Sequence, residues 1–486
     1  MKYFFLAAYA LIMVLIAVFA RRGAKNVNEF VLGGRNVGPW LSAFAYGNSY
    51  FSSVIFIGYA GRNGWNFGVS SLWIAIGNAI IGSLLAWVFL AKPARSMTQR
   101  LKTSTMPEFF NARYSSKWMK IISSAVIFIF LVPYSASVYQ GLGNVFESLF
   151  GIPFIYCMIL MATLTLVYLL VGGYLTTVLG DFFQGIVIFV GVGFMLFFLF
   201  RHMGGVGQAF TALADIGTEL TGLFSTGVST PFALLSLVVL TSFGPWGLPQ
   251  MVHKFYAIKD EKSIPKSMII STIFALLIGG GAYGAGAFSR VVLNNVLPSA
   301  TATSSAYDMV MPNVFYTALP EMLMGLIVVL MLSASISTLS SLVLTSAATV
   351  ALDLFKGVLT PNMSQKNVMI LMRSMCVVFV AASVIISITS VEGIVALMSL
   401  SWGTVAGASI GPFVLGLKWR GATKAGAWAG MIGGLAASIG LTLIMGMSQT
   451  PVTGSIAMAV SFILTWVVSL LTKKPESDLL ALAFGE

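Results

Sequence analysis

The sequence has very little charge for its length. Of its 486 residues, 9% are Asp, Glu, Lys or Arg and 58% are hydrophobic, whereas roughly 25% of the residues of a soluble protein are charged. A helix needs about 20 apolar residues to cross a bilayer, and such stretches recur along the chain. The shortage of charge excludes an ordinary soluble protein and predicts an all-α polytopic membrane protein.

Cysteine and histidine are almost missing. The two cysteines, Cys157 and Cys376, lie within apolar stretches, and the two histidines, His202 and His253, fall in predicted loops. Their spacing forms neither a disulfide framework nor a metal-binding motif. No glycine-rich nucleotide motif or catalytic triad spacing stands out. The sequence therefore argues against an enzyme and implies no organic cofactor.

The charge that is present is mostly positive. The chain has 27 Lys and Arg against 15 Asp and Glu, a formal net charge of +12. The basic residues lie in short segments between apolar stretches, where cytoplasmic loops of membrane proteins are basic. We therefore expect a multi-pass protein of the cell membrane in contact with the lipid bilayer. No nucleic acid partner is expected, and no obligate protein partner is implied.

About thirteen apolar stretches are predicted to span the membrane. Because the basic pair at 21–22 follows the first stretch, we expect a retained span rather than a cleaved signal peptide. With the N-terminus outside and the C-terminus in the cytoplasm, 22 Lys and Arg fall inside and four outside, as the positive-inside rule requires. The predicted spans are 2–20, 37–60, 66–91, 119–148, 153–173, 180–201, 231–250, 267–290, 318–348, 367–390, 393–416, 425–446 and 454–472.

Two of these spans contain helix-breaking residues. The second has "GNS" (47–49) at its middle, and the seventh ends with "GPWGLP" (244–249). Unpaired backbone at membrane depth is tolerated only inside the protein or beside a wet cavity. Breaks at matching positions in two halves indicate a transporter site, although a plain proline kink is the alternative. Their separation predicts an inverted repeat of helices 2–6 against helices 7–11.

These boundaries divide one transmembrane transporter domain (1–486) into several parts. Five helices in each repeat give the two repeats opposite orientations in the membrane. The expected parts are an extra N-terminal helix and loop (1–36), a first repeat (37–201), a second repeat (231–416) and two extra C-terminal helices (425–472).

The ninth predicted span is rich in hydroxyl groups. In "SASISTLSS" (333–341), Ala334, Ser337, Thr338 and Ser341 fall within one arc of about 100° on an α-helix. Such hydroxyls can bond the preceding turn and aid helix packing. They can also contribute to a site for a small cation, which prefers about five oxygen ligands. The broken second span would then supply further carbonyl ligands.

Five segments resemble the sodium:solute symporter family, which includes sodium/proline, sodium/pantothenate, sodium/sugar and sodium/iodide symporters. The resemblance implies a LeuT-like five-plus-five inverted repeat and a sodium-coupled secondary active symporter that imports a small organic solute by alternating access. A proton-coupled transporter of the same fold and a sodium/sugar-type symporter are the alternatives. The segments are "YFSSVIFIGYAGRNG", "TMPEFFNARY", "VYLLVGGYLTTVLGDFFQG", "LSASISTLSSLVLTSAATVALDLF" and "KWRGATKAGAWAGMIGG".

The resemblance also implies a site for sodium, the co-transported ion. The family takes its ligands from the first broken helix and the hydroxyl-rich helix. Asp181, in "GDFFQG", matches the family's aspartate near the sodium release path, although a cytoplasmic helix N-cap is the alternative. By residue match, the ligands are the carbonyls of Asn48, Phe51 and Ala334 and the hydroxyls of Ser337 and Thr338.

Polar and aromatic residues near the two breaks are the substrate-binding candidates, although each can instead serve packing. Proline-type members of the family carry an Asp where this chain has Tyr50, which weakens the case for proline. The motifs still resemble the proline and pantothenate branches most, so we expect a small amino acid or carboxylate. No basic side chain is expected deep in the membrane. The candidates are Tyr50, Ser52, Ser53, Tyr139, Gln140, Thr241, Trp246 and Gln250.

Overall fold

The computed structural model consists almost entirely of helices, which confirms the all-α class. It describes residues 2–20, 27–225, 227–301, 304–390 and 392–485. A helix satisfies its own backbone hydrogen bonds, which is what a segment inside hydrocarbon requires.

The first half of the chain runs from an N-terminal helix to a surface helix. Its elements are α1 (Lys2–Ala20), α2 (Val27–Leu32), α3 (Pro39–Tyr50), η3 (Ile55–Tyr59), α4 (Ala60–Phe67), α5 (Leu72–Gly77), η5 (Asn78–Leu85), η6 (Trp87–Ala91), α6 (Lys92–Arg100), α7 (Met106–Tyr114), α8 (Lys117–Phe150), α9 (Phe154–His202) and α10 (Val206–Ile216).

The second half begins with a bent helix pair and ends with a short helix. Its elements are α11 (Pro231–Gly247), α12 (Pro249–Ala257), α13 (Ser263–Ala287), α14 (Ser289–Val292), α15 (Val310–Ala318), α16 (Glu321–Ala348), η9 (Thr349–Leu359), α17 (Gln365–Thr389), α18 (Ile394–Lys418), α19 (Lys424–Met445), α20 (Thr450–Leu471) and α21 (Ser477–Phe484).

Within the described ranges, nine helices are long and apolar enough to cross a membrane, or ten if the bent pair α11–α12 is one span. The difference from the predicted thirteen arises at three places. The first and fifth predicted spans correspond to the shorter apolar helices Phe4–Phe19 and Phe154–Leu170. The second and third count as one stretch, Ile55–Arg100, because the reversal at Gly68 (φ 57°, ψ −135°) joins α4 directly to a 3-10 turn and leaves no gap between the helical segments.

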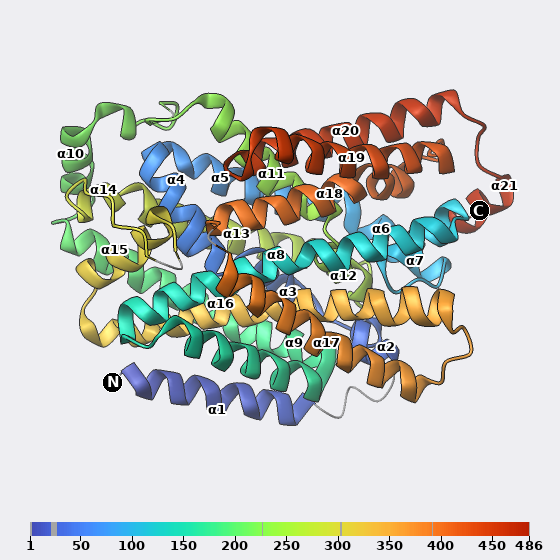
Figure 1. Cartoon of the computed structure of the whole chain (residues 1–486), viewed down its shortest axis with the longest axis horizontal. Helices are drawn as coiled ribbons and strands as arrows, with labels where there is room; N and C mark the ends of the chain where they lie inside the picture. Colours follow the sequence, from blue (N-terminus) through green and yellow to red (C-terminus); the bar gives the residue numbers. More distant parts are fainter. Residues whose placement is uncertain (1, 21–26, 226, 302–303, 391, 486) are drawn as a thin grey trace.

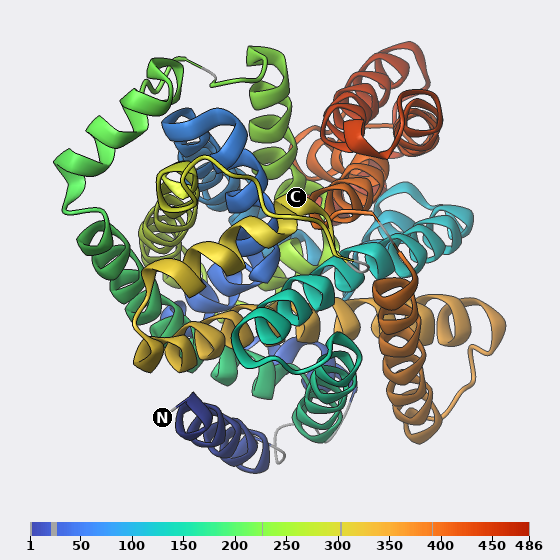
Figure 2. The ribbon, with the colours of Figure 1, turned by 60° about the vertical axis from the view of Figure 1, so that its left-hand side comes forward.

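The bundle is built around α16 and α18. In their most apolar windows, 89% and 94% of the residues are buried, against 28% for α17 and for α19. The N-terminal helix α1 packs along α9 and α16, while α19 and α20 cover α18 on the other side (Figures 1 and 2). Helices α10, α14 and α15 lie at one end of the molecule, and α6, α7 and α21 lie at the other (Figure 1). Segments predicted on opposite sides of the membrane are thus at opposite ends.

Both predicted helix breaks are present. α3 ends at Tyr50, Phe51 is extended (φ −112°, ψ 99°), and the chain is helical again from residue 53. The helix pair α11–α12 bends by 46° at Leu248, which is also extended (φ −87°, ψ 121°). A residue before proline is pushed toward the extended region, and Pro249 then begins the next helix. The seventh span therefore continues to Ala257, seven residues beyond its predicted end at 250.

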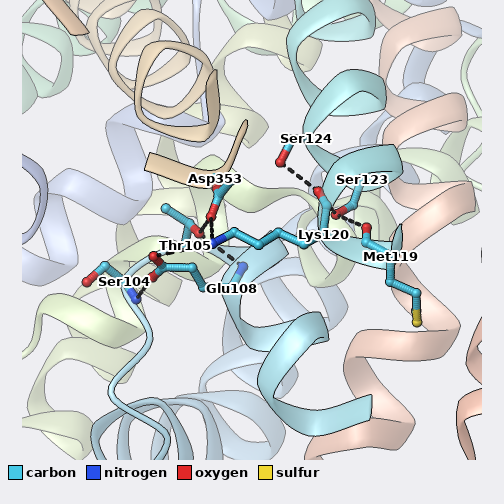
Figure 3. Close-up of polar contacts among 8 residues, drawn as sticks. All are labelled: Ser104, Thr105, Glu108, Met119, Lys120, Ser123, Ser124 and Asp353. Carbon is cyan, nitrogen blue, oxygen red and sulfur yellow. Dashed lines mark hydrogen bonds and ion pairs between the residues drawn. The ribbon is translucent and has the colours of Figure 1, made fainter. Parts of the chain in front are cut away.

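Three charged side chains, Lys120, Asp353 and Glu108, connect three elements at the end predicted to face the cytoplasm (Figure 3). The Lys120 ammonium on α8 lies 3.4 Å from Asp353 Oδ1 in η9 and 3.9 Å from Glu108 Oε1 in α7. The Thr105 hydroxyl also donates to Asp353 Oδ1, at 2.9 Å. Because the Asp353 side chain is fully buried, its charge depends on these partners.

We expect Lys120→Met to destabilise the protein strongly. Removing one partner of a buried pair leaves an uncompensated charge, at a cost of about 3–5 kcal/mol. Thermal unfolding of the purified protein measures the loss. The control is Lys117→Met, because Lys117 is exposed one turn earlier on α8. Equal melting temperatures for the two variants would show that the ion pair contributes little.

Candidate functional site

The break after α3 lies against the hydroxyl-rich helix α16. The Thr338 hydroxyl oxygen is 3.2 Å from the carbonyl oxygen of Asn48 and 3.2 Å from that of Ala334. The Ser337 hydroxyl donates to Asp181 Oδ1 on α9, at 2.5 Å. Four of the five predicted sodium ligands therefore gather at one place, together with the predicted path residue. Carbonyl, hydroxyl and carboxylate oxygens are the ligands that hard cations prefer.

Phe51, the fifth predicted ligand, lies at the break itself. In a continuous helix the Ile55 amide would bond the Phe51 carbonyl. It donates instead to the Ser52 carbonyl, at 3.1 Å. The Phe51 carbonyl is therefore released from the usual helical hydrogen bond with the Ile55 amide.

Asp181 does not cap a helix. It lies inside α9, eight residues beyond the kink at Gly173, where φ is +58°. The alternative of a cytoplasmic N-cap is therefore wrong. Asp181 is fully buried, and its carbonyl accepts a hydrogen bond from Asn48 Nδ2, at 2.5 Å. Its Oδ2 atom has no hydrogen-bond partner among the described residues, so one carboxylate oxygen remains available to a cation.

Lys254 was not predicted as part of the site. It lies in the last turn of α12, is 2% exposed, and donates from Nζ to the Ser341 hydroxyl at 3.0 Å. Ser341 is in turn 3.0 Å from the Ser49 hydroxyl on α3. The ammonium also interacts electrostatically with Asp181. A buried basic side chain therefore lies beside Ser341 and Ser49, close to the α3 break.

A local sequence signal could have located Lys254. Proline is favoured at the first position of a helix, so Pro249 could be interpreted as a helix start instead of the end of a span. That interpretation carries the helix through His253 and Lys254, which the sequence analysis assigned to a loop.

Tyr50 joins the two broken helices. Its hydroxyl donates to the Thr241 carbonyl of α11, at 2.5 Å. A Cβ atom at Gly82 would lie 2.0 Å from the Tyr50 hydroxyl oxygen, so this arrangement needs glycine there. The Thr241 hydroxyl bonds the Leu237 carbonyl of its own helix, at 2.8 Å. In this conformation Tyr50 and Thr241 are occupied with each other and with their own helices.

Ser52 and Ser53 satisfy the backbone around the break. The Ser52 hydroxyl accepts from the Val54 amide at 3.3 Å, and the Ser53 hydroxyl donates to the Val138 carbonyl of α8 at 3.1 Å. The Ser53 amide donates to the Ser335 hydroxyl of α16, at 3.4 Å. These serines thus fix the unwound segment between α8 and α16.

Other candidates have unused polar atoms. Both polar atoms of the Gln250 side chain, the Tyr139 hydroxyl and Gln140 Oε1 are buried and have no hydrogen-bond partner in the described part of the chain. Gln140 Nε2 reaches the Ser390 carbonyl at 3.4 Å. Buried polar atoms are almost always paired, so these three side chains have capacity for a solute or water.

Trp246 lies elsewhere. Its indole N–H donates to the Ile81 carbonyl at 3.0 Å. Its ring centroid is 6.0 Å from that of Phe89, which is 43% exposed on the outside of the bundle. This position fits the packing alternative better than solute binding.

Two aromatic residues were missed by the sequence analysis. Trp402 on α18 and Tyr134 on α8 are fully buried, with ring centroids 5.7 Å apart. The Trp402 ring is also 6.1 Å from Tyr50. The Tyr134 hydroxyl faces Ser52, Trp402 and Thr338, and neither Tyr134 nor Trp402 has a described hydrogen-bond partner for its polar atom. An aromatic wall therefore borders the predicted sodium ligands.

The centre of the site is closed in this conformation. Residues of the α3 break, Gln250 and Trp402 are at most 2% exposed. A solute can reach them only after helices move, which is what alternating access requires.

The model of the sodium:solute symporter family matches residues 30–434. The osmoregulated proline transporter OpuE of Bacillus subtilis (strain 168) is 28% identical over 488 residues, which cover 97% of this chain and 94% of the relative. A sodium/proline symporter of Staphylococcus aureus is 30% identical over 505 residues, which cover 98% and 94%.

Solved transporter structures share the fold. A Na+-coupled sialic acid symporter in a substrate-bound outward-open state superposes with a TM-score of 0.78 at 17% identity, over 98% of each chain. Mhp1, a nucleobase-cation-symport-1 family transporter in a closed conformation, superposes with a TM-score of 0.54 at 14% identity, over 94% of this chain and 98% of the other. The LeuT-like architecture predicted for this chain is thereby confirmed.

Proposed function

This chain belongs to the sodium:solute symporter family and is a sodium-coupled symporter of a small solute, and we propose that the solute is a small amino acid, with proline the first to test. The proposal is supported by two relatives named as proline transporters, each aligned over nearly the whole chain. Tyr50 stands where the proline-type members of the family carry an aspartate, and its hydroxyl is directed to Thr241. Proline would therefore bind here in a different way than in those members. A small carboxylate such as pantothenate is therefore the second solute to test.

Sodium would bind where α3, α16 and α9 meet. The observation that supports this most strongly is the contact of Thr338 Oγ1 with the Asn48 and Ala334 carbonyls. We assign the Phe51 carbonyl and the Ser337 hydroxyl as the remaining ligands. Asp181, bonded to Ser337, would receive the ion as it leaves.

The solute would bind on the other side of the same break. Ser52, Ser53, Tyr139, Gln140 and Gln250 would meet it, with Trp402 and Tyr134 as an aromatic wall. Because sodium and solute would both hold the unwound segment in place, each should raise the affinity for the other by the same factor.

The membrane potential and the sodium gradient would drive transport. We place the protein in the plasma membrane with the N-terminus outside and the C-terminus in the cytoplasm, on the basis of the basic residues at one end. Inward movement of one sodium ion gains about 2.3 kcal/mol per 100 mV. Residues 37–201 and 231–416 would form the two inverted repeats. The first helix pair of each repeat would rock against the other helices around the site.

Uptake into proteoliposomes tests this function. We expect labelled proline to accumulate when an inward sodium gradient is imposed, and not when choline replaces sodium. Excess unlabelled pantothenate distinguishes the two solute classes by competition. Accumulation driven by a proton gradient without sodium would support the proton-coupled alternative, in which Asp181 would carry the proton.

A further inference from the structure

A cavity of about 300 Å³ lies at the end of the molecule predicted to face the cytoplasm. It is open to solvent and is lined by the end of α7, the start of α19 and the segment that joins α20 to α21. In Figure 1 this is the region where α21 returns beside α6 and α7. None of the residues that line the cavity is assigned to sodium or solute.

Positive charge dominates the cavity. Arg113, Lys424, Lys473 and Lys474 line it, and Glu476 is the one acid among its lining residues. Three of these cations come from α19 and the α20–α21 segment, and the fourth comes from α7. The fold therefore brings one buried and three exposed cations from separate elements to one cavity, where their positive potential favours an anion.

Arg113 is the buried member of this group. It is fully buried, and it donates from Nε to the Gly416 carbonyl at 3.0 Å and from Nη2 to the Trp419 carbonyl at 3.3 Å. Its Nη1 atom has no hydrogen-bond partner among the described residues. Burial lowers the pKa of the guanidinium, the direction expected for a cation that lacks an anionic partner.

We propose that this cavity binds a phosphate group, carried either by an anionic phospholipid or by free inorganic phosphate. A guanidinium with a free N–H, together with several ammonium groups, is the combination that recognises phosphate oxygens. The Lys424 ammonium already reaches the Ser115 carbonyl at 3.2 Å, so it is held at the cavity wall. Basic pockets between helices at the cytoplasmic face suit lipid headgroups.

The surroundings fit a lipid. Helices α19 and α20 border the cavity, and only 28% and 33% of their most apolar windows are buried, so their outer faces are available to acyl chains. A bound phosphate would connect α7 to the α20–α21 segment. That connection would add to the contact that Arg100 Nε already makes with the Ala483 carbonyl of α21, at 3.1 Å.

Thermal unfolding of the full chain in nanodiscs tests the proposal. Discs of phosphatidylcholine alone are compared with discs that also contain phosphatidylglycerol, and inorganic phosphate is added to the former at constant ionic strength. We expect an anionic ligand to raise the melting temperature by about 2 °C or more. The rise should disappear in Lys473→Gln/Lys474→Gln and persist in the charge-matched control Lys356→Gln/Lys366→Gln.

The two sources of phosphate, phosphatidylglycerol and inorganic phosphate, give distinguishable results. A rise with phosphatidylglycerol alone identifies a lipid headgroup, and a rise with inorganic phosphate identifies the free ion. The single variant Lys424→Gln, which removes one wall charge, should reduce either rise. Equal responses of the two double variants, or no rise in any arm, would overturn the proposal.

Discussion

Replacing Ser337 or Thr338 with alanine should weaken sodium binding roughly 10- to 150-fold. A hydrogen bond or similar contact to a charged group contributes about 1.5–3 kcal/mol, and each hydroxyl supplies one such contact to the proposed site. The double variant should lose sodium-dependent uptake altogether at ordinary sodium concentrations. Uptake measured over a range of sodium concentrations gives the apparent affinity of each variant.

The control for this prediction lies on the same helix. Thr345→Ala/Ser346→Ala removes the same two kinds of hydroxyl from α16, beyond the contact with the α3 break. Its apparent sodium affinity should stay close to that of the original protein. If both double variants lose sodium affinity to the same extent, the effect comes from α16 in general and the assigned ligands are wrong.

Lys254→Met should destabilise the protein by about 3–5 kcal/mol. The substitution leaves Asp181 buried without the cation that interacts with it and removes the hydrogen bond to Ser341. Adding Asp181→Asn should recover much of the lost stability, because the buried charge is then gone. Thermal unfolding of the two single variants and the double variant measures this coupling.

Transport assays distinguish the contribution of Lys254 and Asp181 to stability from the role of Asp181 in the sodium path. The double variant should fold but fail to transport, because the proposed sodium path has lost its carboxylate. Lys259→Met, in the exposed segment after α12, is the control and should change neither property. Strictly additive losses of stability in the double variant would show that Lys254 and Asp181 do not compensate each other.

The break in the second span was predictable to within a few residues, but the residue at which it occurs was not. Glycine and asparagine at 47–49 indicated a weak helix, but α3 continues to Tyr50. The break comes at Phe51, next to Ser53, whose amide bonds Ser335 and whose hydroxyl bonds Val138. Both partners are far away in the sequence, so local patterns carry no information about them.

Residues inside regular helices were the hardest to predict. Trp402 and Tyr134 lie within long helices, Tyr134 directly after the internal proline Pro133. Only the packing of α8 and α18 against the α3 break brings them together. The hydroxyl-rich stretch of α16 was different. Its composition was anomalous for an apolar helix, so the sequence and the family resemblance together could propose Ser337 and Thr338 as ligands.

We propose above all that sodium and solute bind to the two sides of one unwound segment. Calorimetric titration of the purified protein with proline, in sodium and in choline, tests it most directly. We expect sodium to lower the Kd of proline, and proline to lower the Kd of sodium by the same factor. A proline Kd that is identical in sodium and choline, and that changes with pH instead, would contradict the account.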